Sequence, residues 1–316
     1  MTGPRRRLGA VAAVLAVTLL AACGTDGGSP GGSAGRGGEL LVVATTTQLG
    51  DITRAVAGDR ARVRQILEPR SDPHAYEPRP SDVRAVVDAK VVVRSGGDLD
   101  DWLADVLANA GSSARTLTIL DGLRTRRGAG GIDPHWWQDP RNGAIAAERI
   151  RDALIAADPG GRTAYTAAAE RYTSRLRALD GAIAACMSRI PARRRRLVTD
   201  HDALGYYADR YGIEVIGTVI PALSTQAQAS AGAVARLVRT IRAAGVSTIF
   251  PESSVNPKLT RAIAREAGAT VGPALYADSL GARGTPGATY IGALRSNTLA
   301  LVRGFSTGSA RCALPG

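Results

Sequence analysis

Two kinds of apolar pattern alternate along most of this chain. Short runs rich in Val, Ile and Leu predict strands, because a strand that is buried on both faces shows little polar alternation. We expect strands at 40–45, 63–67, 90–94, 116–120, 197–199, 214–219, 247–250 and 269–271. Amphipathic stretches between them predict helices, including 49–56, 81–88 and 100–109. Ser81 is the expected N-cap of the second helix. The alternation predicts an α/β fold of mostly parallel sheets flanked by helices.

The middle of the chain has a different pattern. Residues 162–188 contain no proline and a single glycine, Gly181, and they are rich in Ala and Arg, which favour helix. Their apolar positions recur every three or four residues, which predicts one helix about 40 Å long. Strand and helix patterns lie on both sides of it. We therefore predict two lobes joined by one long helix, with limits at 39–159, 160–190 and 191–316.

The first 38 residues have the pattern of an export signal followed by a tether. Three arginines precede the apolar stretch 8–22, which is too short to span a bilayer comfortably. Leu20-Ala21-Ala22-Cys23 resembles the bacterial lipobox, in which the cysteine is diacylated and becomes the first residue. We expect a signal peptide at 1–22, a lipid anchor on Cys23 and a flexible Gly- and Ser-rich tether at 23–38, outside the cytoplasmic membrane. The alternative is an ordinary secretory signal that contains a cysteine.

Charge and cysteine content narrow the classes of function. The formal net charge is +12, and almost all of the positive charge is arginine. The arginine run at 193–196 has no aromatic residue interleaved with it, so we interpret it as a solvated surface and expect no nucleic-acid partner. Apart from Cys23, the chain has Cys186 and Cys312. An oxidising compartment favours a disulfide between them, and thiolate ligation of a metal is the alternative.

The chain has only three histidines, and each follows an aspartate by one or two positions within a compact motif. The motifs are DPHAYEP at 72–78, DPHWW at 133–137 and TDHD at 199–202. Each ring follows a predicted strand, directly or after a loop, and a fourth strand end offers Asp278. Because ligands bind at the carboxyl ends of parallel strands, these side chains can meet in one crevice. We predict an N3O metal site of His74, His135, His201 and Asp278. Three unrelated polar histidines are the alternative.

Four segments carry a resemblance to a known family. They are DPHAYEPRPSD at 72–82, DPHWWQDPRN at 133–142, VTDHDALGYYADRYGI at 198–213 and LYADSLG at 275–281. On these motifs the chain resembles the zinc- and manganese-binding solute-binding proteins of ABC transporters. The resemblance implies two lobes joined by a long helix, with a metal between them on the four residues named above. It also implies delivery of the metal to a membrane permease. A metallochaperone is a further candidate partner, and we expect a monomer.

Several acidic residues near the predicted ligands are candidates for orienting the imidazole rings. Glu77, Asp139 and Asp200 could each accept a hydrogen bond from the ring nitrogen that faces away from the metal. Each could equally be a surface acid or a helix cap. Glu252 matches a family position that is not usually a ligand, and we interpret it as structural.

Two segments depart from the family pattern, and two tryptophans allow two interpretations. The loop 121–132 lacks the histidine-rich sequence of many zinc-specific relatives, and 224–230 lacks an acidic residue that many relatives have. The second departure bears on the hinge or on contact with the permease. Trp136 and Trp137 either wall the site from water or pack a loop against a lobe.

The donor atoms bear on which metal is bound and on whether the chain is an enzyme. Nitrogen-rich ligands without sulfur favour Zn²⁺, whereas Mn²⁺ favours more oxygen, as when Asp278 binds through both oxygens. We predict zinc as cargo, with manganese as the alternative, and no enzymatic activity. A secreted zinc hydrolase with Glu77 or Asp202 as base is an alternative of another class, but a fourth protein ligand would occupy the water position. A metal-stabilised adhesin is a further alternative.

Overall fold

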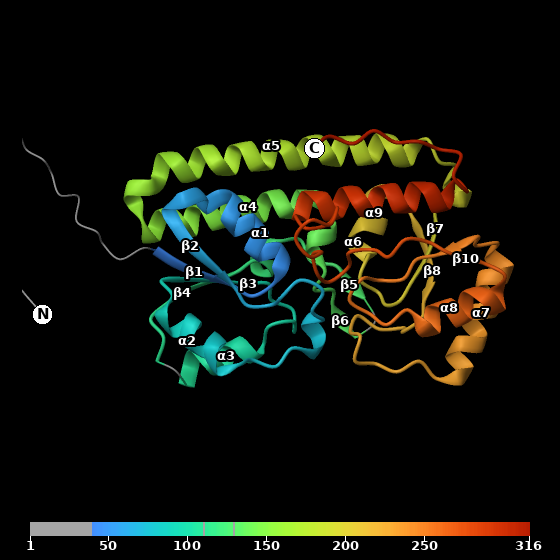
Figure 1. Cartoon of the computed structure of the whole chain (residues 1–316), viewed down its shortest axis with the longest axis horizontal. Coiled ribbons are helices and arrows are strands. Elements are labelled where there is room, and N and C mark those ends of the chain that lie inside the picture. Colours follow the sequence, from blue (N-terminus) through green and yellow to red (C-terminus); the bar gives the residue numbers. More distant parts are fainter. Residues whose placement is uncertain (1–39, 110, 129) are drawn as a thin grey trace, which may run out of the picture. The chain divides into compact units, whose positions relative to one another are not determined.

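This computed structural model describes residues 40–109, 111–128 and 130–316 (Figure 1). The predicted signal peptide, the lipid anchor at Cys23 and the tether therefore lie outside the described residues. Among the helices that are described, none has both the length and the apolar character needed to cross a membrane.

A four-stranded parallel sheet forms the N-terminal half of the described chain. Its spatial order is β2 (Ala61–Gln65), β1 (Leu40–Ala44), β3 (Val91–Arg94) and β4 (Arg115–Thr118). Val42 on β1 lies opposite Val63 on β2 and Val91 on β3. Every residue of β1 is buried, as its unbroken apolar sequence predicts for a central strand of a covered sheet.

Alternate residues along the strands of this sheet pack against different helices. Val42, Val91 and Val93 share a core with helices α1 (Thr47–Ala57) and α4 (Pro140–Ala157). Leu41, Val43 and Val92 belong to a separate core with α2 (Pro80–Asp88) and α3 (Trp102–Asn109). Because adjacent strand residues point to opposite faces, these two cores are the two faces of one sheet. The predicted α/β class, with parallel sheets flanked by helices, is confirmed.

The long helix predicted at 162–188 is confirmed as α5 (Arg162–Ser188). Its buried stripe includes Tyr165, Ala169, Leu176 and Ile183, which recur at the spacing of one helix face. It packs along α4, α1 and α9 (Tyr290–Phe305), and Figure 1 shows it running beside α4 and α9. The lobe limits at 39–159, 160–190 and 191–316 stay a prediction.

The C-terminal half contains two short parallel pairs. These are β7 (Arg196–Thr199) with β8 (Glu214–Thr218), and β9 (Thr248–Ile249) with β10 (Thr270–Val271). The amide of Phe250 donates to the carbonyl of Val198, which joins the two pairs beside β7 and β9. The helices of this half before α9 are α6 (Gly205–Tyr211), α7 (Ala231–Ala244) and α8 (Lys258–Ala267). The larger core runs from the N-terminal sheet along α5 to α6, Phe250 and α9.

Short elements complete the described chain. An antiparallel hairpin that the sequence did not predict joins β5 (Arg127–Gly128) and β6 (Gly131–Ile132). The 3-10 turns are η1 (Gly58–Arg60), η2 (Pro73–Ala75), η3 (Leu120–Gly122), η4 (Trp136–Gln138), η5 (Pro159–Gly161) and η6 (Ala192–Arg194).

The expected N-cap of the helix at 81–88 was wrong by two residues. The N-cap is Arg79, the helix begins at Pro80, and Ser81 lies inside the first turn. Proline suits the first helical position because its missing N–H needs no partner there. The Asp82 carboxylate accepts the amide hydrogen of Arg79, so an acid at the third helical position, and not the serine, caps this end.

A disulfide joins Cys186, near the end of α5, to Cys312 in the C-terminal tail, with the two Cα atoms 5.7 Å apart. The tail also packs Leu314 on the main core, and the Leu314 carbonyl accepts a hydrogen bond from Arg295 on α9. The bridge thus fastens the tail beside α5 and α9. Bonded sulfurs offer no thiolate, so in this form the alternative of metal ligation by these cysteines does not hold.

We expect the double variant Cys186→Ser and Cys312→Ser to lower the free energy of unfolding by about 2–4 kcal/mol, because the bridge restricts the unfolded chain over a long loop. Urea unfolding followed by circular dichroism would measure this loss. Reduction of the wild-type protein should produce the same change, whereas equal midpoints for the variant and the oxidised wild type would contradict a stabilising role.

Candidate metal centre

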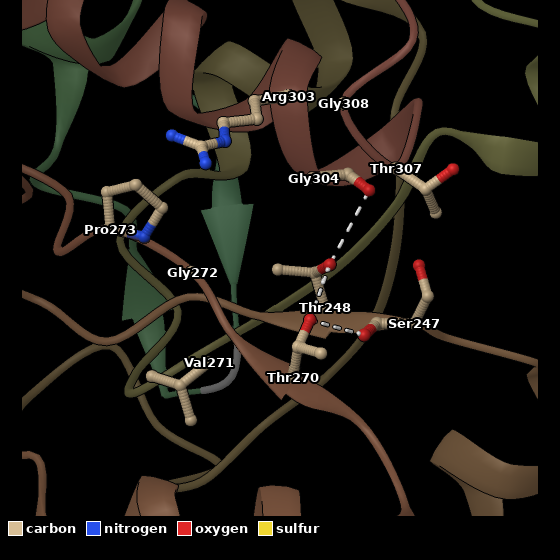
Figure 2. A pocket seen from close by; sticks show the side chains of 10 residues that line it. All are labelled: Ser247, Thr248, Thr270, Val271, Gly272, Pro273, Arg303, Gly304, Thr307 and Gly308. Carbon is tan, nitrogen blue, oxygen red and sulfur yellow. Dashed lines mark hydrogen bonds between the residues drawn. The ribbon is translucent and has the colours of Figure 1, made fainter.

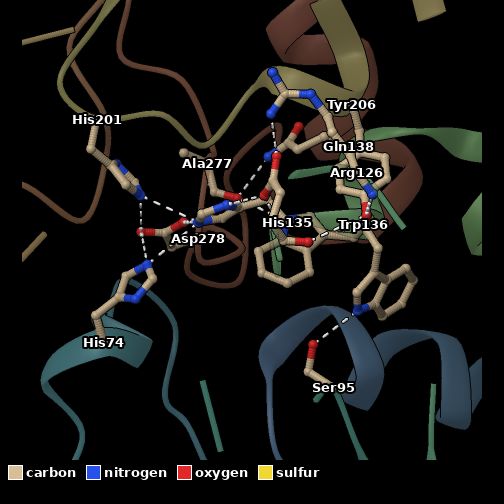
Figure 3. A network of polar contacts seen from close by, with 12 residues as sticks. His74, Ser95, Arg126, His135, Trp136, Gln138, His201, Tyr206, Ala277 and Asp278 are labelled. Atoms are coloured by element: carbon tan, nitrogen blue, oxygen red, sulfur yellow. Dashed lines mark hydrogen bonds and ion pairs between the residues drawn. The ribbon is translucent and has the colours of Figure 1, made fainter. Parts of the chain in front are cut away.

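Four side chains that are far apart in the sequence converge at one point in the structure. They are His74, His135, His201 and Asp278, and each offers one ligand atom within 4.8 Å of the others. Figure 3 shows the three rings directed toward the carboxylate. The structure therefore brings together all four residues that the sequence singled out.

Each of the four residues lies beyond a strand or a strand-like segment. His74 lies in η2, after β2, and His201 follows β7 directly. His135 follows the β5–β6 hairpin, and Asp278 comes shortly after Leu275, which forms an isolated parallel bridge with Glu252. The crevice at the carboxyl ends of parallel strands is therefore the place where these loops meet.

The spacing of the donor atoms matches a small tetrahedral cation. The Nε2 atom of His135 lies 3.4 Å from Nε2 of His74 and 3.3 Å from Nε2 of His201. The Asp278 carboxylate lies 3.3 Å from Nε2 of both His135 and His201, and 3.8 Å from that of His74. A tetrahedral zinc ion with bonds of about 2.0–2.1 Å separates its ligand atoms by about 3.3 Å.

Carboxylates fix the orientation of two of the rings. Nδ1 of His135 lies 2.7 Å from Asp133, and Nδ1 of His201 lies 2.6 Å from Glu252. An ionised carboxylate only accepts hydrogen bonds, so each Nδ1 carries a hydrogen, and a ring that becomes neutral has its lone pair at Nε2. The Nε2 atoms point at one another and at the carboxylate of Asp278.

Asp278 is the residue that most needs a positive neighbour. Its side chain is fully buried, and apart from the imidazole Nε2 atoms its two oxygens have no hydrogen-bond partner in the described chain. A buried carboxylate without a donor is costly unless a cation or protons neutralise it. Burial alone would raise its pKa, but the adjacent imidazoles of His201 and His135 outweigh burial and hold the pKa well below the usual range. The charge therefore stays at the centre of the cluster.

Without a metal, protons take the place of the cation on two of the rings. Burial lowers the pKa of His135, but Asp133 and Asp278 outweigh it and hold this pKa at about 9. At His201 burial is likewise outweighed, by Asp278 and Glu252, and the pKa lies well above its usual value. Burial lowers the pKa of His74 to about 4. His74 is thus the neutral ring of the three at pH 7.

Three residues proposed to orient the imidazoles do not contact them. Asp139 is the N-cap of α4: it accepts from the amide of Arg141 and pairs with the Arg141 guanidinium. Glu77 is exposed, and no contact of its carboxylate with a ring is found in the described chain. Asp200 accepts from the Glu252 amide and from the hydroxyl of Thr260, so it holds the residue that orients His201. These three expectations were wrong.

The two acids that do orient rings were missed in this role. For Asp133 the sequence held a local signal, the DPH motif. In both DPH motifs the aspartate accepts the backbone amide hydrogen of the histidine two residues later. Glu252 had none, since it is 51 residues from His201 and reaches it only through the fold. Glu252 is not among the four clustered ligand residues, but the interpretation as structural did not include its contact with the His201 ring.

Further groups hold the orienting carboxylate and the ligand loops. The Arg126 guanidinium lies 2.6 Å from Oδ2 of Asp133, whereas Oδ1 of this carboxylate contacts His135. The indole N–H of Trp137 donates to the carbonyl of Ala277, next to Asp278, and that of Trp136 donates to the Ser95 hydroxyl (Figure 3). Both tryptophans are buried, and the Trp137 ring packs 5.4 Å from that of His135. These contacts agree with the interpretation that the tryptophans pack the loops.

A separate pocket lies elsewhere and lacks this chemistry. It has a volume of about 550 Å³ and is lined by the start of β9, by β10 with the two residues that follow it, and by the end of α9 (Figure 2). Its hydroxyl groups bond within the cavity wall: Thr248 contacts Thr270 and the carbonyl of Gly304. No imidazole, thiol or carboxylate belongs to its lining, so it offers no comparable ligand set for a metal.

Comparison with known proteins places the chain in a family. Residues 42–304 match the model of a family described as "Zinc-uptake complex component A periplasmic". The chain belongs to this family. Its members are substrate-binding proteins of transport systems, so the predictions of a binding protein of an ABC importer and of no enzymatic activity are confirmed.

The relatives bear the names of different metals. The manganese-binding lipoprotein MntA of Bacillus subtilis is 33% identical over 302 residues, which cover 92% of this chain and 97% of that one. The iron-binding protein YfeA of Yersinia pestis is 31% identical over 84% of this chain and 86% of its own length. The solved periplasmic zinc-binding protein TroA of Treponema pallidum is 27% identical, with a TM-score of 0.80 over 85% of this chain and 99% of TroA.

We expect Glu252→Gln to weaken binding of a divalent metal by about 10–100-fold, because the His201 ring loses the carboxylate that fixes its tautomer. A competition titration with a chromogenic chelator would measure the affinity. Glu77→Gln is the matched control, since it removes an acid that contacts no ring. Equal affinities for the two variants would contradict the orienting role of Glu252.

Proposed function

We propose that this protein captures a divalent transition metal outside the cytoplasm, with Zn²⁺ preferred, and delivers it to an ABC permease. The proposed ligands are His74, His135, His201 and Asp278. The observation that carries the proposal is the buried Asp278 carboxylate, which is faced by three imidazole nitrogens and has no other hydrogen-bond partner in the described chain.

The charge around the cluster supports a cation as the ligand. Three buried carboxylates, from Asp133, Glu252 and Asp278, lie against the rings, while Arg126 contacts only the first of them. Neutral rings would therefore leave an excess of negative charge in a largely buried site. A divalent cation offsets this excess and accepts the Nε2 lone pairs at the same time.

The donor set supports zinc as the preferred cargo. Three nitrogen atoms and one carboxylate, without sulfur, suit tetrahedral Zn²⁺, and the separations of 3.3–3.4 Å fit that geometry. Manganese is the alternative, because both oxygens of Asp278 face imidazoles and binding through both would give five-coordination. The names of the relatives span manganese, iron and zinc, so they support a transition metal in general.

The proposed route of the metal follows from the cellular location. A diacylated Cys23 would hold the protein at the outer face of the cytoplasmic membrane, and the tether at 23–38 would leave it free to reach the permease. Two relatives, each aligned over 97% of its own length, are named as lipoproteins, and this supports the lipid anchor. We further propose a monomer with lobes at 39–159 and 191–316 joined by the helix at 160–190, and a metallochaperone as a candidate donor or acceptor.

Capture requires that the metal lose its water as the ligands close around it. His135 and His201 are fully buried, whereas the His74 side chain keeps 8% of its exposure. Hinge opening is restricted because the largest core is continuous along α5 into both halves. Exchange of the metal therefore depends on movement of a loop, and we propose the loop of His74, because His74 is the partly exposed one of the four ligand residues.

We expect His201→Ala to weaken zinc binding at least about 100-fold. The loss of a metal ligand should lower the affinity more than the loss of a group that only orients a ligand. Asp278→Asn, which keeps the shape but removes the charge, should have a similar effect. Calorimetric or fluorescence titration would measure affinity, with circular dichroism to verify the fold. Asp202→Asn is the control, as it changes a neighbouring acid outside the ligand set. A folded His201→Ala variant with wild-type affinity would remove His201 from the site.

We expect metal binding at pH 7 to release about two protons, because His135, with a pKa of about 9, and His201, with a raised pKa, must both become neutral. Affinity should therefore rise as the pH increases from 7 toward 9, while His74, with a pKa of about 4, adds nothing in this range. Calorimetric titrations in two buffers of different ionisation enthalpy would count the protons. Binding without proton release would contradict the protonated state of the metal-free site.

A further inference from the structure

The three proposed imidazole ligands are held in unequal ways. The rings of His135 and His201 are fixed by carboxylates at Nδ1. In the described chain, no carboxylate contacts Nδ1 of His74. The contact that positions His74 is instead made by its backbone amide, which donates to Oδ1 of Asp72, the N-cap of η2. The place of this ring therefore depends on where Asp72 is held.

Asp72 is held from the other half of the chain. The hydroxyl of Thr225 donates to the second oxygen, Oδ2, at 2.6 Å, across a separation of 153 residues. Thr225 lies in the segment between β8 and α7, and it is half-buried. One aspartate side chain thus receives the His74 amide on one oxygen and the Thr225 hydroxyl on the other.

The segment that carries Thr225 is also tied to the loop of another ligand. The amide of Ile220 donates to the carbonyl of Asp200 at 2.7 Å, and the amide of Asp202 donates to the carbonyl of Ala222 at 3.0 Å. These two bonds flank His201 on both sides in the sequence. The Thr225–Asp72 contact therefore connects the loop of His201 with the loop of His74, two of the loops that carry the proposed metal ligands.

We propose that Thr225 is a positioning residue that latches the His74 loop over the metal and sets the rate at which the metal leaves. The proposal rests on the function proposed above. His74 is the partly exposed member of the cluster, so its outward movement opens the shortest way to solvent. This movement requires the Thr225–Asp72 hydrogen bond to break or the two loops to move together.

The backbone contact at Arg70 shows why the hydroxyl matters. The Arg70 amide lies within hydrogen-bonding distance of the Ser279 hydroxyl (2.7 Å) and the Leu280 carbonyl (3.2 Å), which holds the start of the His74 loop beside Asp278. That tie stays in place when Thr225 is changed. Loss of the hydroxyl should therefore free the end of the loop that carries the ring, without detaching the loop as a whole.

The test compares metal release from three variants with release from the wild type. Zinc-loaded protein is mixed rapidly with an excess of a chromogenic chelator, and the release rate is recorded. Thr225→Val keeps the shape but removes the hydroxyl, and it should release zinc about tenfold faster, as expected for loss of one hydrogen bond to a charged acceptor. Thr225→Ser keeps the hydroxyl and should restore a rate close to that of the wild type.

Thr218→Val is the matched control. It removes the hydroxyl of a threonine that donates to the carbonyl of Ile220 within the same half of the chain, at 2.8 Å. This variant should release zinc at the wild-type rate. Equal acceleration by Thr218→Val and Thr225→Val would overturn the latch in favour of general loosening of the segment, and so would a wild-type rate for Thr225→Val. A wild-type protein that binds no zinc would instead overturn the proposed cargo, which separates the two failures.

Discussion

The negative charge of Asp278, buried among three imidazole rings, is the constraint on which the rest of the site depends. Its carboxylate lies 3.3 Å from the Nε2 atoms of His135 and His201, and among the described residues it has no partner other than the imidazole rings. Burial of an unpaired carboxylate costs several kcal/mol. The fold can keep this arrangement only with positive charge at its centre, supplied either by protons or by a metal. Because the two compete for the same nitrogen atoms, capture of a metal is also an exchange of charge.

The surroundings of the four ligands divide into a rigid part and an adjustable part. Asp133 and Glu252 hold two rings through their Nδ1 atoms, in a region closed to solvent. His74 is held through its backbone and lies at the exposed side. A core that continues along α5 from one half to the other opposes a wide opening of the crevice. Rigid ligands favour tight binding, while an adjustable third ring allows the ion to enter and leave.

Much of the fold and of the ligand set could be predicted from the sequence, for identifiable reasons. The 162–188 helix lacks proline and keeps one apolar stripe, so local preference and packing agree. The ligands could be identified from the sequence because the chain has only three histidines and each lies in a compact motif that follows a strand. Asp139 shows the limit of such motifs: an acid followed by proline is also the signature of a helix start, and the cap is what the structure contains. Glu252 depends on contacts between distant segments, which no local pattern reports.

X-ray absorption spectroscopy of the zinc-loaded protein tests the central claim most directly, because it reports which atoms surround the metal. Our account predicts three imidazole nitrogens and one or two carboxylate oxygens at about 2.0–2.2 Å, with no sulfur. A spectrum dominated by sulfur, or one with water oxygens and no imidazole signal, would show that the metal is bound elsewhere and would contradict the account.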